Sequence, residues 1–137
     1  MNRVELQQLS ELRLRESGAL LGAGFPDGAY YLAGYAVECA LKACIAKRTR
    51  EHDFPEKKLV NDSHTHDLGK LLQLAELKDE LDAAISADPA LGLALDKISD
   101  WSETSRYQRK SAQEAEALLK AIEDQTGGLL PWIRLHW

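Results

Sequence analysis

The sequence predicts an all-α protein, an up-and-down bundle of four to five helices, and two observations support this prediction. Apolar residues recur at three- and four-residue intervals along most of the 137 residues, whereas the alternation typical of a half-buried strand is nearly absent. Helix start signals also stand at the beginning of the periodic segments. At this length we expect one domain, residues 1–137.

The first two helices are predicted over residues 3–21 and 27–50. The turn GAGFPDG separates them, and its Pro26 suits the first turn of the second helix. Residues 29–45 of the second helix are mostly apolar around the whole circumference, so this helix should lie at the centre of the bundle or partly against a second subunit. Its small residues favour close helix packing: Ala29, Ala33, Gly34, Ala36, Ala40 and Ala43.

Three further helices are expected after a polar loop, EHDFPEKKLVNDSHT. Their start signals are Thr65 as a cap, Asp88 followed by Pro89, and a capping box from Ser111 to Glu114. Their core-facing stripes are Leu68, Leu71, Leu72 and Ala75; Leu91, Ala94, Leu95 and Ile98; and Ala115, Leu118, Leu119 and Ile122. Gly127 and Gly128 should end the last helix. The apolar end LLPWIRLHW should dock in the core or in a dimer groove.

Composition bounds the classes of function. Hydrophobic residues make up 45% and charged residues 28%, which is typical of a globular protein and argues against disorder. A net charge of -5 argues against strong non-specific nucleic-acid binding by the whole surface. A local basic patch is still compatible with the sequence, because basic residues cluster in KRTR (47–50), EKK (56–58) and RYQRK (106–110).

Targeting signals and cysteines point to the cytoplasm. No apolar run approaches the ~20 residues that span a bilayer, and the N-terminus lacks the apolar region of a signal peptide, so we expect no membrane association. Cys39 and Cys44 lie on different sides of one helix and are expected to be buried free thiols, as in a reducing compartment.

A polar stripe runs along the second predicted helix. At 100° per residue, Tyr31, Tyr35, Glu38 and Lys42 share an arc of about 60°. One interpretation is an i,i+4 ion pair that lets this stripe meet water. The other is a site in which Glu38 orients a cation from another helix, with Arg106 as the candidate, because a buried carboxylate needs a partner.

Several segments in this order resemble the HEPN domain of prokaryotes. They are YYLAGYAVECALKA, HDLGKLLQLA, a tryptophan followed shortly by RY, and the terminal GGLLPWIRLHW, and the resemblance extends from about Gly18 to Trp137. It implies an up-and-down helical bundle, commonly a dimer, with a polar cleft near the subunit interface. Members of the family act as metal-independent RNases in toxin–antitoxin and defence systems, or accompany a minimal nucleotidyltransferase. Others are non-catalytic and are associated with binding RNA or nucleotides.

The catalytic members carry an arginine followed, after four to six residues, by a histidine. The guanidinium holds the scissile phosphate, and the histidine moves the proton of the 2′-hydroxyl. Arg106 and Tyr107 match the RY position, but Ser111, Ala112 and Gln113 occupy the places where the histidine is expected. No arginine in the chain has a histidine at that spacing, and the nearest case, Arg48 and His52, has three residues between.

The resemblance and the stripe together define a candidate ligand-binding cleft, and no cofactor is expected. Its residues are Tyr35, Glu38, Lys42, His66, Arg106 and Tyr107. His64 and His66 lack the further ligands of a metal site, so no metal is expected. Trp101 and Tyr107 could stack on a base or could be core aromatics.

The leading hypothesis is a homodimeric HEPN-like module that binds RNA or a nucleotide without the usual cleavage dyad. Its partner would be a nucleotidyltransferase or an antitoxin. One alternative is a metal-independent endoribonuclease with an atypical pair, such as His66 with Arg106. The other is a purely structural module that contacts a second protein.

Overall fold

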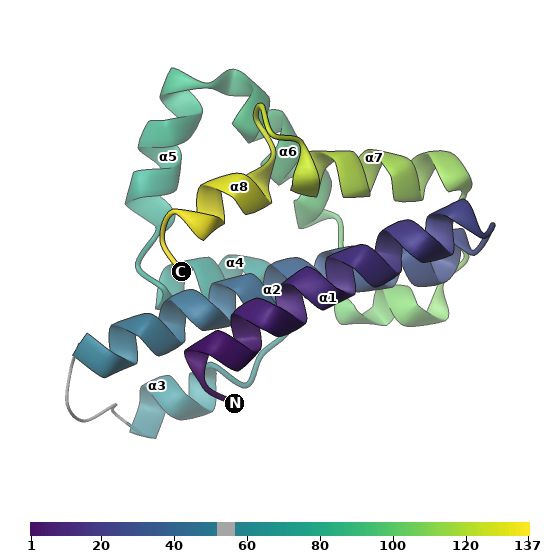
Figure 1. Cartoon of the computed structure of the whole chain (residues 1–137). Coiled ribbons are helices and arrows are strands. Elements are labelled where there is room, and N and C mark those ends of the chain that lie inside the picture. The colour runs from purple at the N-terminus through teal and green to yellow at the C-terminus, as the bar shows by residue number, and fades with distance from the viewer. Residues whose placement is uncertain (52–56) are drawn as a thin grey trace.

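The computed structural model describes residues 1–51 and 57–137, and within these ranges every regular element is a helix (Figure 1). The all-α prediction is therefore confirmed for these residues. The helices are α1 (Arg3–Gly22), α2 (Pro26–Glu51), α3 (Lys57–Asp62), α4 (Leu68–Leu74), α5 (Lys78–Ala87), α6 (Pro89–Ser99), the 3₁₀ helix η1 (Glu103–Tyr107), α7 (Ala112–Glu123) and α8 (Leu129–Arg134).

The eight α-helices of these residues exceed the predicted four to five because short helices occupy segments without strong local signals. The predicted loop 51–65 contains α3, while its residues 52–56 lie outside the described ranges. The segment before Asp88 forms α5, which buries Leu81 and ends one residue before Asp88, the N-cap of α6. Short helices of this kind depend on packing more than on their own propensity.

Helices α1 and α2 form a closely packed pair, seen side by side in Figure 1. The Ser10 hydroxyl donates to the carbonyl of Ala36, and the Ser17 hydroxyl donates to the carbonyl of Ala29, each at 2.7 Å. Both serines are fully buried, and the two contacts lie seven residues apart on each helix. Small side chains on α2 let these hydroxyls reach the opposite backbone, which confirms the prediction of close helix packing.

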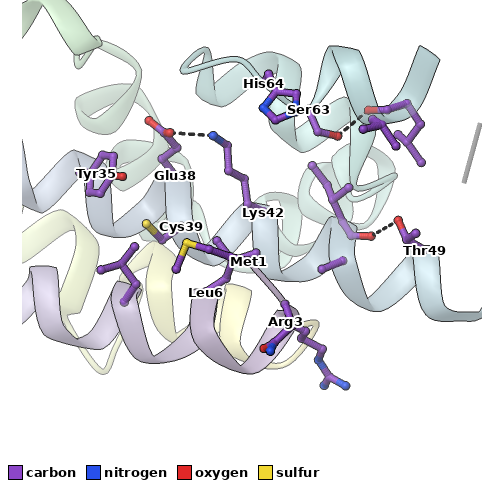
Figure 2. A pocket seen from close by; sticks show the side chains of 16 residues that line it. Met1, Arg3, Leu6, Tyr35, Glu38, Cys39, Lys42, Thr49, Ser63 and His64 are labelled. Carbon is purple, nitrogen blue, oxygen red and sulfur yellow. Dashed lines mark hydrogen bonds and ion pairs between the residues drawn. The ribbon is translucent and has the colours of Figure 1, made fainter. Parts of the chain in front are cut away.

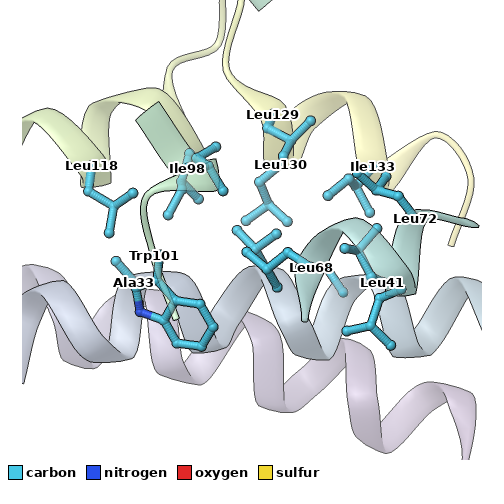
Figure 3. Close-up of a cluster of buried hydrophobic side chains, with 14 of the residues drawn as sticks. Ala33, Leu41, Leu68, Leu72, Ile98, Trp101, Leu118, Leu129, Leu130 and Ile133 are labelled. Carbon is cyan, nitrogen blue, oxygen red and sulfur yellow. The ribbon is translucent and has the colours of Figure 1, made fainter. Parts of the chain in front are cut away.

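The main hydrophobic core lies between α2 and the later helices (Figure 3). Helices α4, α6, α7 and α8 all contact α2 or one another there. The largest buried side chains of this core include Leu41, Leu68, Leu71, Leu72, Ile98, Leu118, Ile122, Leu129, Leu130 and Ile133. The predicted core-facing stripes and the docking of the apolar end against the core are confirmed, and α2 is the central helix.

The helix boundaries confirm two start signals and correct two other predictions. Asp88 caps α6 with Pro89 in its first turn, and Ser111 forms the capping box of α7 with Glu114. Thr65 is not the cap of α4, because the Asp67 carboxylate accepts from the Lys70 backbone N–H at 3.0 Å. Helix α7 ends at Glu123, before Gly127–Gly128, and these glycines turn the chain into α8.

Both cysteines are buried free thiols, as predicted. Burial raises the pKa of the Cys39 thiol to about 11 and that of the Cys44 thiol to about 12. Among the helices of residues 1–51 and 57–137, none combines the length and the apolar character required to cross a bilayer.

Candidate functional site

The structure divides the six predicted cleft residues between two regions. We call Glu38, Lys42 and His66 the Glu38 cluster, and residues 106–110 the basic segment. Tyr35 lies one turn before Glu38 on α2, whereas Arg106 and Tyr107 belong to the basic segment. Each region is held by a different part of α2.

In the Glu38 cluster, a buried carboxylate is paired with two basic side chains, those of Lys42 and His66. Glu38 is 2% exposed, and its Oε1 accepts from Lys42 Nζ at 2.9 Å. His66 Nδ1 lies 2.9 Å from Oε1 and 3.0 Å from Oε2. The predicted i,i+4 pair is therefore confirmed, but the carboxylate itself does not meet water. The side chains of Lys42 and His66 are 23% and 52% exposed, so these two residues form the solvent-accessible part of the cluster.

His66 also lines a polar hollow. A cavity of about 380 Å³ lies here, lined by His64, Thr65, His66, Asp67, Trp101, Ser102 and Glu103. Within the described ranges, Nδ1 is the His66 ring atom that makes hydrogen bonds. A neutral ring that donates Nδ1–H to Glu38 presents Nε2 as a proton acceptor. The contact with the buried carboxylate therefore fixes the orientation of a ring that lines the hollow.

A larger groove opens on the other side of Glu38, between the start of α1, the second half of α2, and α3 (Figure 2). Its volume is about 480 Å³, and Tyr35, Glu38, Cys39 and Lys42 line one end. The Tyr35 ring stacks on Tyr31 with centroids 6.1 Å apart. Burial, together with the neighbouring Cys39 and Glu38, raises the pKa of the Tyr35 phenol. Tyr35 is therefore un-ionised at neutral pH, and it contributes its ring to the wall of the groove.

Trp101 is a core aromatic residue, which is one of the two interpretations offered by the sequence, and its buried indole is not available to stack on a base. Its indole is buried, donates from Nε1 to the Tyr31 carbonyl at 3.2 Å, and stacks on the Tyr31 ring with centroids 6.1 Å apart. Gly34 leaves the space that the indole fills, since a Cβ there would collide with the ring. Trp101 thus anchors the start of the segment that leads to η1.

The basic segment lies on the surface and is fixed to the start of α2. Asp27 Oδ1 accepts from the Lys110 backbone N–H at 2.6 Å, and Asp27 Oδ2 lies 3.3 Å from Arg109 Nε. The Arg106 guanidinium lies 4.8 Å from the centroid of the Tyr107 ring. Tyr107 is 78% exposed and the Arg109 side chain is 97% exposed. Tyr107 is therefore not a core aromatic.

The expected pairing of Glu38 with Arg106 is not formed. Lys42 and His66 occupy the Glu38 carboxylate, while Arg106 packs on Tyr107. Asp27, which holds the basic segment, and Lys42 lie 15 residues apart on α2, which corresponds to about 22 Å of helix. Arg106 and Tyr107 line neither the hollow beside His66 nor the groove beside Lys42.

Sequence reasoning missed Asp27, the residue that fixes the basic segment. Its place after Pro26 indicated a helix start, which α2 confirms. Nothing local to the sequence could show that its carboxylate meets Lys110, 83 residues away. Within the described ranges, no group of three or more His, Cys, Asp and Glu side chains is arranged to hold a metal ion.

Comparison with family models matches the chain to the HEPN domain over residues 5–125. This range begins near the start of α1 and ends after α7, so it contains both the Glu38 cluster and the basic segment. No curated protein and no solved structure gives a significant match.

Proposed function

The chain belongs to the HEPN domain family, and from this premise we propose that it is an RNA-binding helical module that lacks the usual cleavage dyad. The observation that carries the proposal is the basic segment, where Arg106, Tyr107 and Arg109 are all exposed on a segment held by Asp27. A fixed surface of this kind loses little conformational freedom when it binds a ligand.

The chemistry of the basic segment suits single-stranded RNA. Exposed guanidinium groups hold phosphate oxygens, and an exposed aromatic ring accepts an unstacked base. Arg106 lies over one face of the Tyr107 ring, which leaves the rest of this exposed ring accessible to a base. Because the whole chain carries a net charge of -5, binding should be confined to this segment and should weaken steeply with salt.

The missing histidine supports binding rather than cleavage at this segment. The residues at the expected spacing after Arg106 are Ser111, Ala112 and Gln113, which begin α7 and lack a group that can take a proton near neutral pH. The proposal also includes a homodimer and a nucleotidyltransferase or antitoxin partner, both of which follow from the family resemblance alone.

Fluorescence anisotropy with a labelled single-stranded RNA at low salt tests the proposal. We expect Arg106→Ala to weaken binding by roughly tenfold, because it removes one charge-assisted contact. Lys78→Ala is the matched control, since it removes one exposed cation from α5. Equal affinities for the wild type and Arg106→Ala, or equal losses in both variants, would show that this segment is not the RNA site.

A second function, RNA cleavage at an atypical site, is favoured by the Glu38–His66 contact. Glu38 would be a positioning residue, and His66 Nε2 would take the proton from a 2′-hydroxyl in the polar hollow. The 2′-oxygen would then bond to phosphorus, the bond from phosphorus to the 5′-oxygen would break, and the imidazolium would return the proton to that oxygen.

Incubation of the purified protein with tRNA separates the two functions. Cleavage that is abolished by His66→Ala and retained by His64→Ala would support the second function, because His64 is a neighbouring exposed histidine, whereas His66 is the one that is hydrogen-bonded to Glu38. Intact tRNA in the presence of the wild-type protein would exclude cleavage and leave RNA binding by the basic segment as the function.

A further inference from the structure

Beyond RNA binding, we propose that the groove between α1, α2 and α3 binds a small organic anion, a molecule with an apolar body and one anionic head group. This site is independent of the basic segment, because it lies along the second half of α2 (Figure 2). Its volume of about 480 Å³ lies within the range of about 300–1,000 Å³ that is usual for small-molecule sites.

Most of the groove wall is apolar, although Asn2 and Arg3 also line it at the start of α1, where Arg3 Nη2 donates to the Trp137 carbonyl. The apolar side chains come from three helices: Leu6 and Leu9 of α1, Ile45 and Ala46 of α2, and Leu59 and Val60 of α3. Helix α3 has no buried residue, and Val60 is exposed, so apolar side chains face each other here without filling the space between them. Apolar surface of this kind gains free energy when a ligand of matching character covers it.

The hydroxyls along the groove do not require a polar ligand. Thr49 Oγ1 donates to the Ile45 carbonyl at 3.0 Å, and Ser63 Oγ donates to the Leu59 carbonyl at 2.6 Å, as the dashed lines in Figure 2 show. Both hydroxyls are therefore satisfied by their own helices, and the walls they belong to behave as apolar surface.

The polar end of the groove presents a cation. Figure 2 shows Lys42 extending from α2 to reach Glu38 at this end. Glu38 is buried and its oxygens are engaged by Lys42 and His66, so the carboxylate is shielded. The partly exposed Lys42 ammonium has three donors and uses one of them on Glu38. His64 lines the same end.

These features select the class of ligand. A cationic ligand would need an accessible carboxylate at the polar end, and Glu38 does not supply one. An anionic head can instead accept from the remaining Lys42 donors, while its body lies along the leucine, isoleucine and valine side chains. A fatty carboxylate has an anionic head and a fully apolar body, whereas a nucleoside monophosphate has the anionic head on a polar body, and the test below distinguishes the two.

The test follows binding of anilinonaphthalene sulfonate, a fluorescent probe with an aromatic body and a sulfonate head, to the full chain. We expect saturable binding to one site. Decanoate should displace the probe at a concentration about tenfold lower than decanol, because decanol has the same body without the charge. Displacement by AMP as well would identify a nucleotide as the natural source, and displacement by decanoate alone an aliphatic acid. Equal displacement by decanol and decanoate would overturn the proposal.

Two variants locate the site. Lys42→Met should reduce decanoate affinity about tenfold and leave decanol affinity unchanged. Because this change also removes a partner of buried Glu38, Val60→Glu provides a second variant that places a negative charge on the exposed wall of α3. Leu93→Glu is its matched control on the exposed face of α6. Val60→Glu should therefore weaken decanoate binding, whereas Leu93→Glu should leave it unchanged. If both variants bind decanoate as tightly as the wild type, the groove is not the anion site, whatever the result of the RNA-binding experiment.

Discussion

The Glu38 cluster and the basic segment both contain charged groups beside tyrosines, but they differ in solvent exposure. Glu38 is buried, with Lys42 bonded to its Oε1 and His66 Nδ1 in contact with both of its oxygens. In the basic segment, Arg109 is almost fully exposed and Arg106 lies on the ring of exposed Tyr107. The first region has charges that hold one another in place, and the second has charges that solvent or a ligand can reach.

This difference shows why the solvent exposure of a charged group decides whether it contributes to the stability of the fold or to binding. In the buried cluster each group depends on its partners, because an unpaired carboxylate there would lose hydration without compensation. In the basic segment the same kind of group is hydrated, so its removal should change binding and leave folding nearly unaffected. Substitutions in the Glu38 cluster should therefore mainly lower the stability of the fold, and substitutions in the basic segment should mainly weaken ligand binding.

The largest effect on stability should come from Trp101, which joins the two regions. Trp101→Ala removes a buried indole, its hydrogen bond to the Tyr31 carbonyl and its stacking on Tyr31, so we expect a loss of about 3–5 kcal/mol in the free energy of unfolding. Urea unfolding, followed by circular dichroism, measures this loss of stability. Tyr107→Ala is the control and should change stability by less than about 0.5 kcal/mol. Similar losses in both would mean that Trp101 is not a core residue.

A smaller loss is expected from the buried carboxylate. Glu38→Gln keeps the shape of the side chain but weakens the hydrogen bonds from Lys42 and His66, so we expect a loss of about 2 kcal/mol at neutral pH. Asp27→Asn is the same change at the half-exposed anchor of the basic segment and should cost below about 1 kcal/mol. The reverse order in urea unfolding would contradict the contrast between the two regions.

The two buried thiols of α2 should make stability fall at alkaline pH. Cys39 and Cys44 have pKa values of about 11 and about 12 in the folded chain, above the value of about 8.5 for an exposed thiol. Because each folded-state pKa is raised, the stabilisation is complete below about pH 8.5 and is lost as the pH rises through the folded values. We expect about 2 kcal/mol or more per thiol over this range.

Unfolding of the wild type and of the Cys39→Ala, Cys44→Ala double variant between pH 8 and pH 11 isolates this contribution. Tyrosines and lysines also titrate in this range, and they are common to both proteins. The double variant should lose less stability than the wild type as the pH rises. Parallel losses in the two proteins would show that the thiols are accessible to water in the folded chain.

The smallest effect on stability should come from Arg109, whose side chain is almost fully exposed. Arg109→Ala should change the free energy of unfolding by less than about 0.5 kcal/mol, because its contact with Asp27 is exposed to solvent. The same variant should lower the slope of log affinity for RNA against log salt by about one, which corresponds to one lost phosphate contact. An unchanged slope would exclude Arg109 from the RNA surface.

Local signals in the sequence predicted much of the fold. Asp88 with Pro89, and Ser111 with Glu114, start helices where expected, because capping involves residues within one turn of each other. The same holds for the apolar stripes and for the Glu38–Lys42 pair, which is one turn long. Thr65 is one exception, because Asp67 caps α4 instead where two residues that can cap stand close together. The end of α7 at Glu123, before Gly127 and Gly128, is another.

The candidate site could be predicted only in part. Periodicity correctly put Tyr35, Glu38 and Lys42 on one side of α2, and the groove lies along that side. It could not show that His66, 28 residues away, would take the place beside Glu38 that was expected for Arg106. Nor could it show that Trp101 would fill the space above Gly34, since that depends on where η1 crosses α2.

The sequence by itself therefore determined the helical class, most helix starts and the composition of the polar stripe, because these depend on residues three or four positions apart. Only the tertiary structure decided which partners the charged side chains meet. Asp27 holds a segment 83 residues away, and Glu38 is paired with the residue that precedes the cap of α4. Such contacts depend on how whole helices pack, and the burial that packing creates separates the charges that hold the fold from those that remain accessible to a ligand.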